Sequence, residues 1–136
     1  MNDRTLQQLV AEAAGGDLAA FRALLEQSPA WVETLRDSLT GLVVTKEGLL
    51  KVLVAFQRQS FLEDLVQRWA SFIRRGYFGS SPAPRRPLDI RYDDSAEQEI
   101  VEFVSRLDEL GDAVDGTISG EELSKMIGAL RGEAMV

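Results

Sequence analysis

The sequence predicts an all-α protein, and two observations carry that prediction. Apolar residues recur at spacings of three and four through most of the 136 residues. The pattern stops over residues 77–94, where glycine, serine and proline gather. We therefore expect a compact bundle of about five helices over 1–76, a Pro/Gly-rich linker over 77–94 and a C-terminal helical hairpin over 95–132. At this length we expect a single helical domain, 1–136, with the hairpin packed on the bundle.

Residues that cap a helix N-terminus mark several of the expected helix starts. Asp17, Ser28 and Thr45 each precede a run of apolar periodicity, where a side-chain oxygen can accept a hydrogen bond from an open backbone amide. Ser60 has Glu63 three residues later, which is the pattern of a capping box. The helix after Thr45 is apolar on almost every side, which predicts a place at the centre of the bundle.

The linker should be stiff and mostly non-helical. Pro82, Pro84 and Pro87 exclude a helix there and favour an extended polyproline conformation. Residues 88–92 alternate apolar and charged side chains, a pattern compatible with a short extended segment. The sequence shows no partner strand for it, so strand formation stays open at this point.

The composition excludes several chemistries. Histidine and cysteine are both absent, which rules out thiolate nucleophiles, Ser-His-Asp triads and ordinary zinc sites. No other constellation satisfies the requirements of an active site, so we expect a protein that is not an enzyme and that carries no cofactor. With no apolar run long enough for a membrane span and no secretory signal at the N-terminus, we expect a cytoplasmic protein without membrane contact.

The net charge of −7 is concentrated in the C-terminal part of the chain. Residues 1–76 hold nine acids and nine bases, whereas residues 89–136 hold thirteen acids and four bases. Such asymmetry indicates an interaction surface. We expect an acidic partner-binding face made by Asp108, Glu109, Asp112, Asp115, Glu121 and Glu122.

This profile is typical of proteins that act by binding another protein. Immunity proteins, antitoxins, phage-encoded inhibitors and adaptor subunits are likewise short, acidic and without catalytic residues. The expected partner is a protein with a basic surface, because opposite charges steer association. A homodimer is the other open arrangement.

A second candidate surface interleaves bases with aromatic side chains. Its members are Arg74, Arg75, Tyr77, Phe78, Arg85 and Arg86. Such a mixture can grip nucleic acid by phosphate contact and stacking. However, the chain as a whole is acidic, which does not favour direct nucleic-acid binding. The arginines could instead pair with the acidic C-terminal third, within the chain or across a dimer.

Residues 111–122 resemble an EF-hand calcium loop in their second half. With Gly116 at loop position six, Asp115 stands at position five, Thr117 at seven and Glu122 at twelve. Positions one and three are Gly111 and Ala113, which offer no side-chain oxygen. A calcium-responsive module with Asp115 and Glu122 as ligands is therefore the alternative function.

The same residues also fit a capped turn between two helices. Ser119 and Glu122 have the capping-box spacing, and Asp115-Gly116 is a typical turn pair in which glycine can take a positive φ. This interpretation includes no metal. It makes the loop an architectural element of the acidic hairpin.

Overall fold

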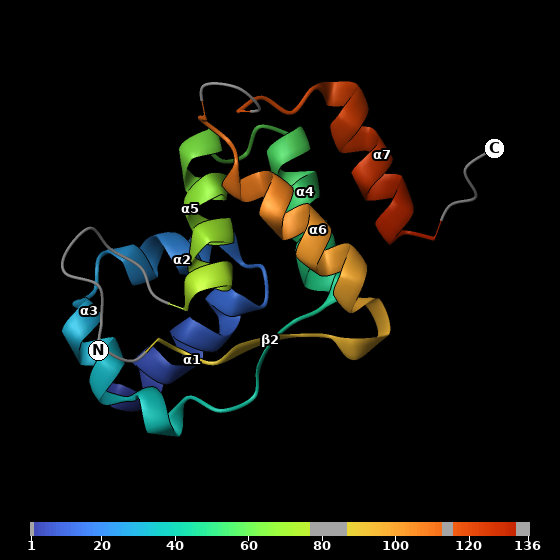
Figure 1. Ribbon diagram of the computed structural model, residues 1–136. Helices are drawn as coiled ribbons and strands as arrows, with labels where there is room; N and C mark the ends of the chain where they lie inside the picture. The colour runs from blue at the N-terminus through green and yellow to red at the C-terminus, as the bar shows by residue number, and fades with distance from the viewer. Residues whose placement is uncertain (1, 77–86, 113–115, 133–136) are drawn as a thin grey trace.

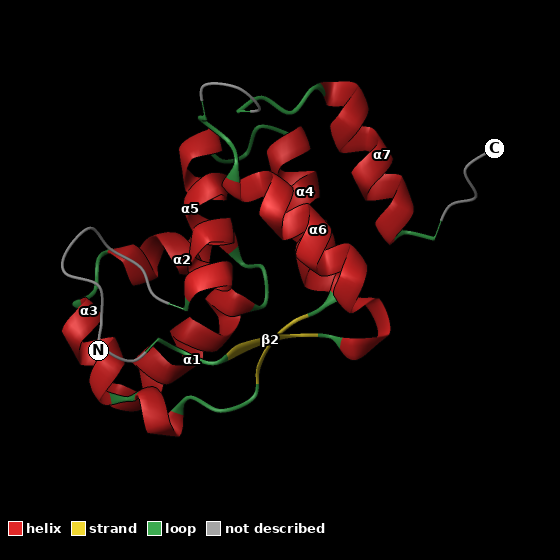
Figure 2. Cartoon of the chain, viewed as in Figure 1, coloured by secondary structure: helices red, strands yellow, loops and turns green. Residues whose placement is uncertain are grey.

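The computed structural model describes residues 2–76, 87–112 and 116–132 (Figure 1). This part of the chain is mostly helical, as the sequence predicts, and it also contains a small two-stranded sheet (Figure 2). None of the helices in these ranges combines the length and the apolar content that a membrane crossing requires. The elements are α1 (Asp3–Ala14), α2 (Leu18–Leu25), α3 (Pro29–Thr34), β1 (Leu42–Val44), α4 (Lys46–Gln57), α5 (Glu63–Arg75), β2 (Ile90–Tyr92), α6 (Glu97–Asp108) and α7 (Gly120–Leu130), with single-turn 3₁₀ helices at Arg36–Ser38 and Asp94–Ala96.

Three of the predicted helix starts form as expected. The side chains of Asp17, Ser28 and Thr45 each accept a hydrogen bond from the backbone N–H three residues later, at 3.0, 3.4 and 3.0 Å. The bonds from Ala20 and Gly48 satisfy amides of the first helical turn. The N–H of Trp31 also donates to the carbonyl of Ser28, at 3.1 Å. The helices α2, α3 and α4 therefore begin where the sequence places them.

The capping box predicted at Ser60 and Glu63 is wrong. Gln59 has a φ of 56°, and the N–H of Ser60 donates to the carbonyl of Ala55 at 3.0 Å, so these two residues close the end of α4. The helix α5 begins only at Glu63, after Leu62, and no side chain caps it. The short connection cannot both end α4 and cap α5 with the same residues. In this structure Gln59 and Ser60 end α4.

The extended segment expected within residues 88–92 forms β2, and its partner is β1. The strands run parallel, with Leu42 opposite Ile90 and Val44 opposite Tyr92. Leu42 and Val44 are buried while Val43 between them is exposed, as in a strand that covers a core on one side. The end of the expected linker is therefore tied to the N-terminal part of the chain. The sequence does not reveal β1, because three residues are too few to establish a period of two.

The two helices of the expected C-terminal hairpin pack on different partners. The helix α6 lies along α5, and α7 lies along α4 (Figure 1). Farther from them, α1 and α2 pack on each other and α2 contacts α5. Among the described residues, α6 and α7 make few close contacts with each other. Each arm of the hairpin is thus held mainly by its own helix of the N-terminal part.

Aromatic side chains lie at the centre of the core. The rings of Phe21 and Phe72 stack with their centroids 5.4 Å apart. Trp69, which its place on an apolar stripe marks as a core residue, is fully buried. Its indole N–H donates to the carbonyl of Ala13 at 2.8 Å. An unpaired buried N–H would cost about 1–3 kcal/mol, so this bond is what allows tryptophan at the centre.

The corner between α1 and α2 packs directly against the first turn of α4. Gly16 has a φ of +99°, which favours glycine. A Cβ on Gly48 would collide with the carbonyl of Gly15, and a Cβ on Gly16 would collide with the carbonyl of Gly48. Both obstacles are backbone atoms, which cannot rotate aside. Glycine at positions 16 and 48 therefore sets how closely α4 approaches this corner.

The prediction that α4 lies at the centre of the bundle is only partly correct. Leu49, Val52 and Leu53 are fully buried, but Leu50 and Val54 on another face are only half-buried. The surrounding helices cover α4 from one side and leave a strip of apolar surface on the other.

Candidate functional site

A groove lies between α6 and α7, in the acidic part of the chain. Its volume is about 350 Å³, and its lining includes Glu102, Phe103, Arg106, Glu109, Glu122 and Met126. Three carboxylates and one guanidinium thus stand beside two apolar side chains. We call this feature the acidic groove.

Helical spacing explains why these side chains meet. Glu102, Arg106 and Glu109 are four and then three residues apart, so they lie on one side of α6. Glu122 and Met126 are four apart on the facing side of α7. The helix α6 therefore presents a charged row to the groove, and α7 presents one carboxylate and one apolar side chain.

Arg106 connects the two helices across the groove. Its Nε donates to Glu122 Oε2 at 2.6 Å and its Nη2 donates to Glu122 Oε1 at 3.1 Å. On its own helix, Nη1 donates to Glu109 Oε2 at 3.0 Å. Nη2 also donates to the carbonyl oxygen of Thr117 at 2.7 Å. A guanidinium that meets a carboxylate through two parallel bonds is strongly fixed in orientation, so Arg106 is a structural centre of the groove.

The charges of this pair reinforce each other. The hydrogen bond from Arg106 lowers the pKa of Glu122 below its ordinary value of 4.5, and partial burial opposes that shift. The same bond raises the pKa of Arg106 above its ordinary value. Both groups are therefore held in their charged forms at neutral pH.

Arg106 also engages two oxygens that the EF-hand comparison assigns to calcium. The Thr117 carbonyl stands at loop position seven and the Glu122 carboxylate at position twelve, and both accept hydrogen bonds from the guanidinium. A calcium ion would have to displace this internal cation to reach them. Asp115 lies outside the described residues, and the part of the chain that the structure covers contains no cluster of three acids able to hold a metal.

The glycine that takes a positive φ in this loop is not the one that the sequence predicts. Gly111, and not Gly116, takes the positive φ, at +91°. Gly116 is required for another reason, because a Cβ there would collide with the backbone of Asp112. The N–H of Gly111 donates to the carbonyl of Gly116 at 3.0 Å and closes the turn.

Ser119 caps α7 as predicted, but the capping box is not reciprocal. The Ser119 hydroxyl accepts a hydrogen bond from the N–H of Glu122 at 3.0 Å. In a full capping box the Glu122 carboxylate would return to the amide of Ser119. It bonds to Arg106 instead, because a charged donor is a stronger partner than a backbone amide.

The structure separates the six acids of the predicted partner-binding face. Glu109 and Glu122 line the acidic groove, whereas Asp112 and Glu121 are exposed and are not among its lining residues. Asp115 lies outside the described residues. Glu102 also lines the groove and was not predicted, although its seven-residue spacing from Glu109 on a helix indicates a shared face.

Asp108 lies on the opposite side of α6 from the acidic groove. Its side chain is only 5 % exposed and accepts from Arg74 at 2.6 Å and from Gln67 at 2.9 Å. Both donors belong to α5. Asp108 therefore joins α6 to α5 and is not available to a partner.

The same contact accounts for one member of the basic-aromatic surface. Arg74 pairs within the chain with Asp108 of the acidic C-terminal third, which is one of the two pairings that the sequence leaves open. Arg75 is exposed at the end of α5. Tyr77, Phe78, Arg85 and Arg86 lie outside the described residues.

Comparison with protein-family models, with curated proteins and with solved structures finds no match for this chain.

Proposed function

We propose that this protein is a small acidic helical interaction protein, which binds another protein through the acidic groove. The observation that carries the proposal is the composition of the groove, in which carboxylates surround the apolar side chains of Phe103 and Met126. A partner that places an apolar residue beside a lysine or arginine complements both features. Binding surfaces commonly combine an apolar centre with a charged rim in this way.

The accessible carboxylates support a basic partner. The Glu109 side chain is 45 % exposed and the Glu121 side chain is 82 % exposed, although each also has a cation nearby. Glu102 is exposed at the mouth of the groove. Together with the excess of acids over residues 89–136, these groups favour the approach of a basic protein.

Arg106 supports a binding role over a calcium-responsive one. It fixes Glu109 and Glu122 in orientation, so the groove is preorganised before a partner arrives. It also engages the oxygens that calcium would require. The absence of histidine and cysteine removes the commonest catalytic side chains. Within this class of interaction protein, we therefore propose an immunity or antitoxin protein, a phage inhibitor or an adaptor-like subunit of the cytoplasm.

Charge reversal in the groove tests the proposal. The tagged chain is used to capture its partner from the native host at low salt, and the variant Glu102→Lys/Glu109→Lys should lose most of the captured protein. The matched control is Glu12→Lys/Glu26→Lys, which changes the net charge equally at exposed sites on α1 and after α2. Equal capture by the groove variant and the wild type would reject this function.

A further inference from the structure

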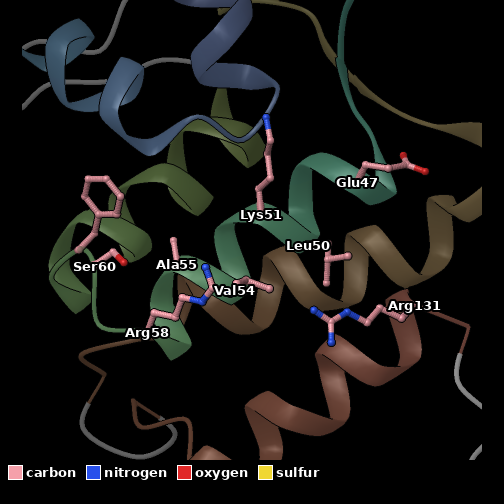
Figure 3. Close-up of a pocket in the computed structure, with 9 residues that line it drawn as sticks. Glu47, Leu50, Lys51, Val54, Ala55, Arg58, Ser60 and Arg131 are labelled. Carbon is pink, nitrogen blue, oxygen red and sulfur yellow. The ribbon is translucent and has the colours of Figure 1, made fainter.

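A second groove of opposite charge lies against α4. It has a volume of about 430 Å³, and Figure 3 shows its lining residues. The apolar part consists of Leu50, Val54 and Ala55 of α4 together with Phe61. These are the half-buried residues that the packing of α4 leaves uncovered. We call this feature the basic groove.

Two arginines from separate helices converge on this apolar surface. Arg58 follows the last residue of α4 and Arg131 follows the last residue of α7. Their guanidinium groups point toward one another across the face that carries Val54 (Figure 3). The negative end of a helix dipole explains why each end tolerates a cation. It does not explain why two cations from different helices converge over apolar side chains.

The part of the chain that the structure describes supplies no counter-ion for these charges. Among the residues that the structure describes, no acid forms an ion pair with Lys51, Arg58 or Arg131. Glu47 is the acid in the lining, and it points away from both arginines (Figure 3). Like charges that converge without a counter-ion repel each other, so the unbound groove favours an incoming anion.

The neighbouring surface extends both properties of the groove. The guanidinium of Arg22 lies over the Phe61 ring, 4.8 Å from its centroid, and adds a further cation at that end. Leu62, the next residue, is 79 % exposed. Arg22 and Leu62 therefore both neighbour Phe61, the first in space and the second in sequence.

We propose that the basic groove binds an acidic amphipathic helix of a partner protein. One apolar side chain of that helix packs on Leu50 and Val54, and a neighbouring carboxylate lies between Arg58 and Arg131, where it can accept from both. A nucleic acid would leave the apolar strip of the groove unfilled. This inference does not depend on the proposed function of the acidic groove.

Titration of the full chain with a defined probe tests this assignment. The probe is a synthetic helical peptide with leucines at spacings of three and four, flanked by glutamates. A second peptide carries lysine in place of every glutamate. We expect the acidic peptide to bind and the lysine peptide not to bind. In Arg58→Glu/Arg131→Glu the dissociation constant should rise about tenfold or more, as for loss of close charge pairs.

Two variants separate this site from general charge effects. Arg4→Glu/Arg75→Glu reverses two other exposed arginines and should leave peptide affinity within about twofold of wild type. The variant Glu102→Lys/Glu109→Lys tests the acidic groove. In this variant, binding of the acidic peptide should still depend on Arg58 and Arg131. The two proposals can therefore fail separately.

Several results would overturn the assignment. One is absence of acidic-peptide binding at about millimolar concentration, and another is equal loss of affinity in the Arg4/Arg75 control. Sedimentation of the chain alone supplies a third. If the wild type self-associates and Arg58→Glu/Arg131→Glu is monomeric, the occupant is a second copy and not an acidic helix of another protein.

Discussion

Arg106 of α6 and Glu122 of α7 lie face to face across the acidic groove, with 2.6 Å between Nε and Oε2. Because α6 and α7 pack mainly on other helices, this pair is a principal link between the two. It also places one positive charge among the carboxylates that we propose as a binding surface. The stability of the groove and its readiness for a partner therefore depend on the same contact.

Removal of this link should lower stability measurably. We expect Arg106→Ala to reduce the free energy of unfolding by about 1–2 kcal/mol, because Glu109, Thr117 and Glu122 all lose a charged donor. Urea denaturation of Arg106→Ala, Glu122→Gln and the double variant measures the coupling. The exposed pair Lys125–Glu121 is the control, and Lys125→Ala should cost less than about 0.5 kcal/mol. Additive effects of Arg106→Ala and Glu122→Gln would contradict the link.

The lowered pKa of Glu122 predicts an acid-sensitive contribution to stability. The unfolded chain takes up the Glu122 proton near the ordinary pKa of 4.5, while the folded chain holds the carboxylate charged to lower pH. This contribution is complete above the ordinary pKa and is lost as the pH falls through the lowered one. We expect the difference in Tm between wild type and Glu122→Gln to be constant near pH 7 and to shrink below the ordinary pKa. A difference that grows on acidification would show that the sign is wrong.

The close approach at Gly48 should make even a methyl group harmful. We expect Gly48→Ala to reduce the free energy of unfolding by about 1–3 kcal/mol, because the new Cβ meets the fixed carbonyl of Gly15. This loss should exceed the gain in helix propensity. Gly120→Ala is the matched control, since no atom lies within 4 Å of a Cβ built there. Thermal unfolding of both variants measures the two losses of stability. An equal loss at the two positions would argue against the contact between Gly48 and Gly15.

Asp108 should act on stability and not on partner binding. Its side chain is nearly buried and accepts from Arg74 and Gln67 of α5. We expect Asp108→Asn to lower the free energy of unfolding by about 1–3 kcal/mol, since a charged hydrogen bond is lost where solvent replaces it poorly. Partner capture at a temperature where the variant is folded should remain at the wild-type level. A stable variant that no longer captures the partner would place Asp108 at the interface after all.

Calcium should leave the wild-type chain unchanged. Because the Arg106 guanidinium engages Thr117 and Glu122, millimolar calcium should produce neither binding heat nor a shift in Tm, as calorimetry can measure. Magnesium at equal ionic strength controls for screening of the acidic surface. A calcium-specific rise in Tm would revive the calcium-responsive alternative.

The parts of the fold that follow local rules could be predicted from the sequence. Apolar periodicity identifies the helices, and Asp17, Thr45 and Ser119 cap the helices that follow them, because a cap depends only on residues a few positions away. Where two local rules competed, as at Ser60 between α4 and α5, the prediction failed. The parallel pairing of β1 with β2 was also out of reach, because the two strands are separated by two helices.

The candidate site shows the same division between what the sequence determined and what only tertiary structure decided. The sequence alone places a large excess of negative charge in the C-terminal part, provides neither histidine nor cysteine, and sets the helical spacing of the acids. Tertiary packing decided what each charge does: it turned Asp108 toward α5, joined Glu122 to Arg106, and brought Arg58 and Arg131 together from the ends of two helices. The physical reason is that charge content is a property of the chain, whereas a charge acquires a partner only when folding brings distant residues within a few ångströms.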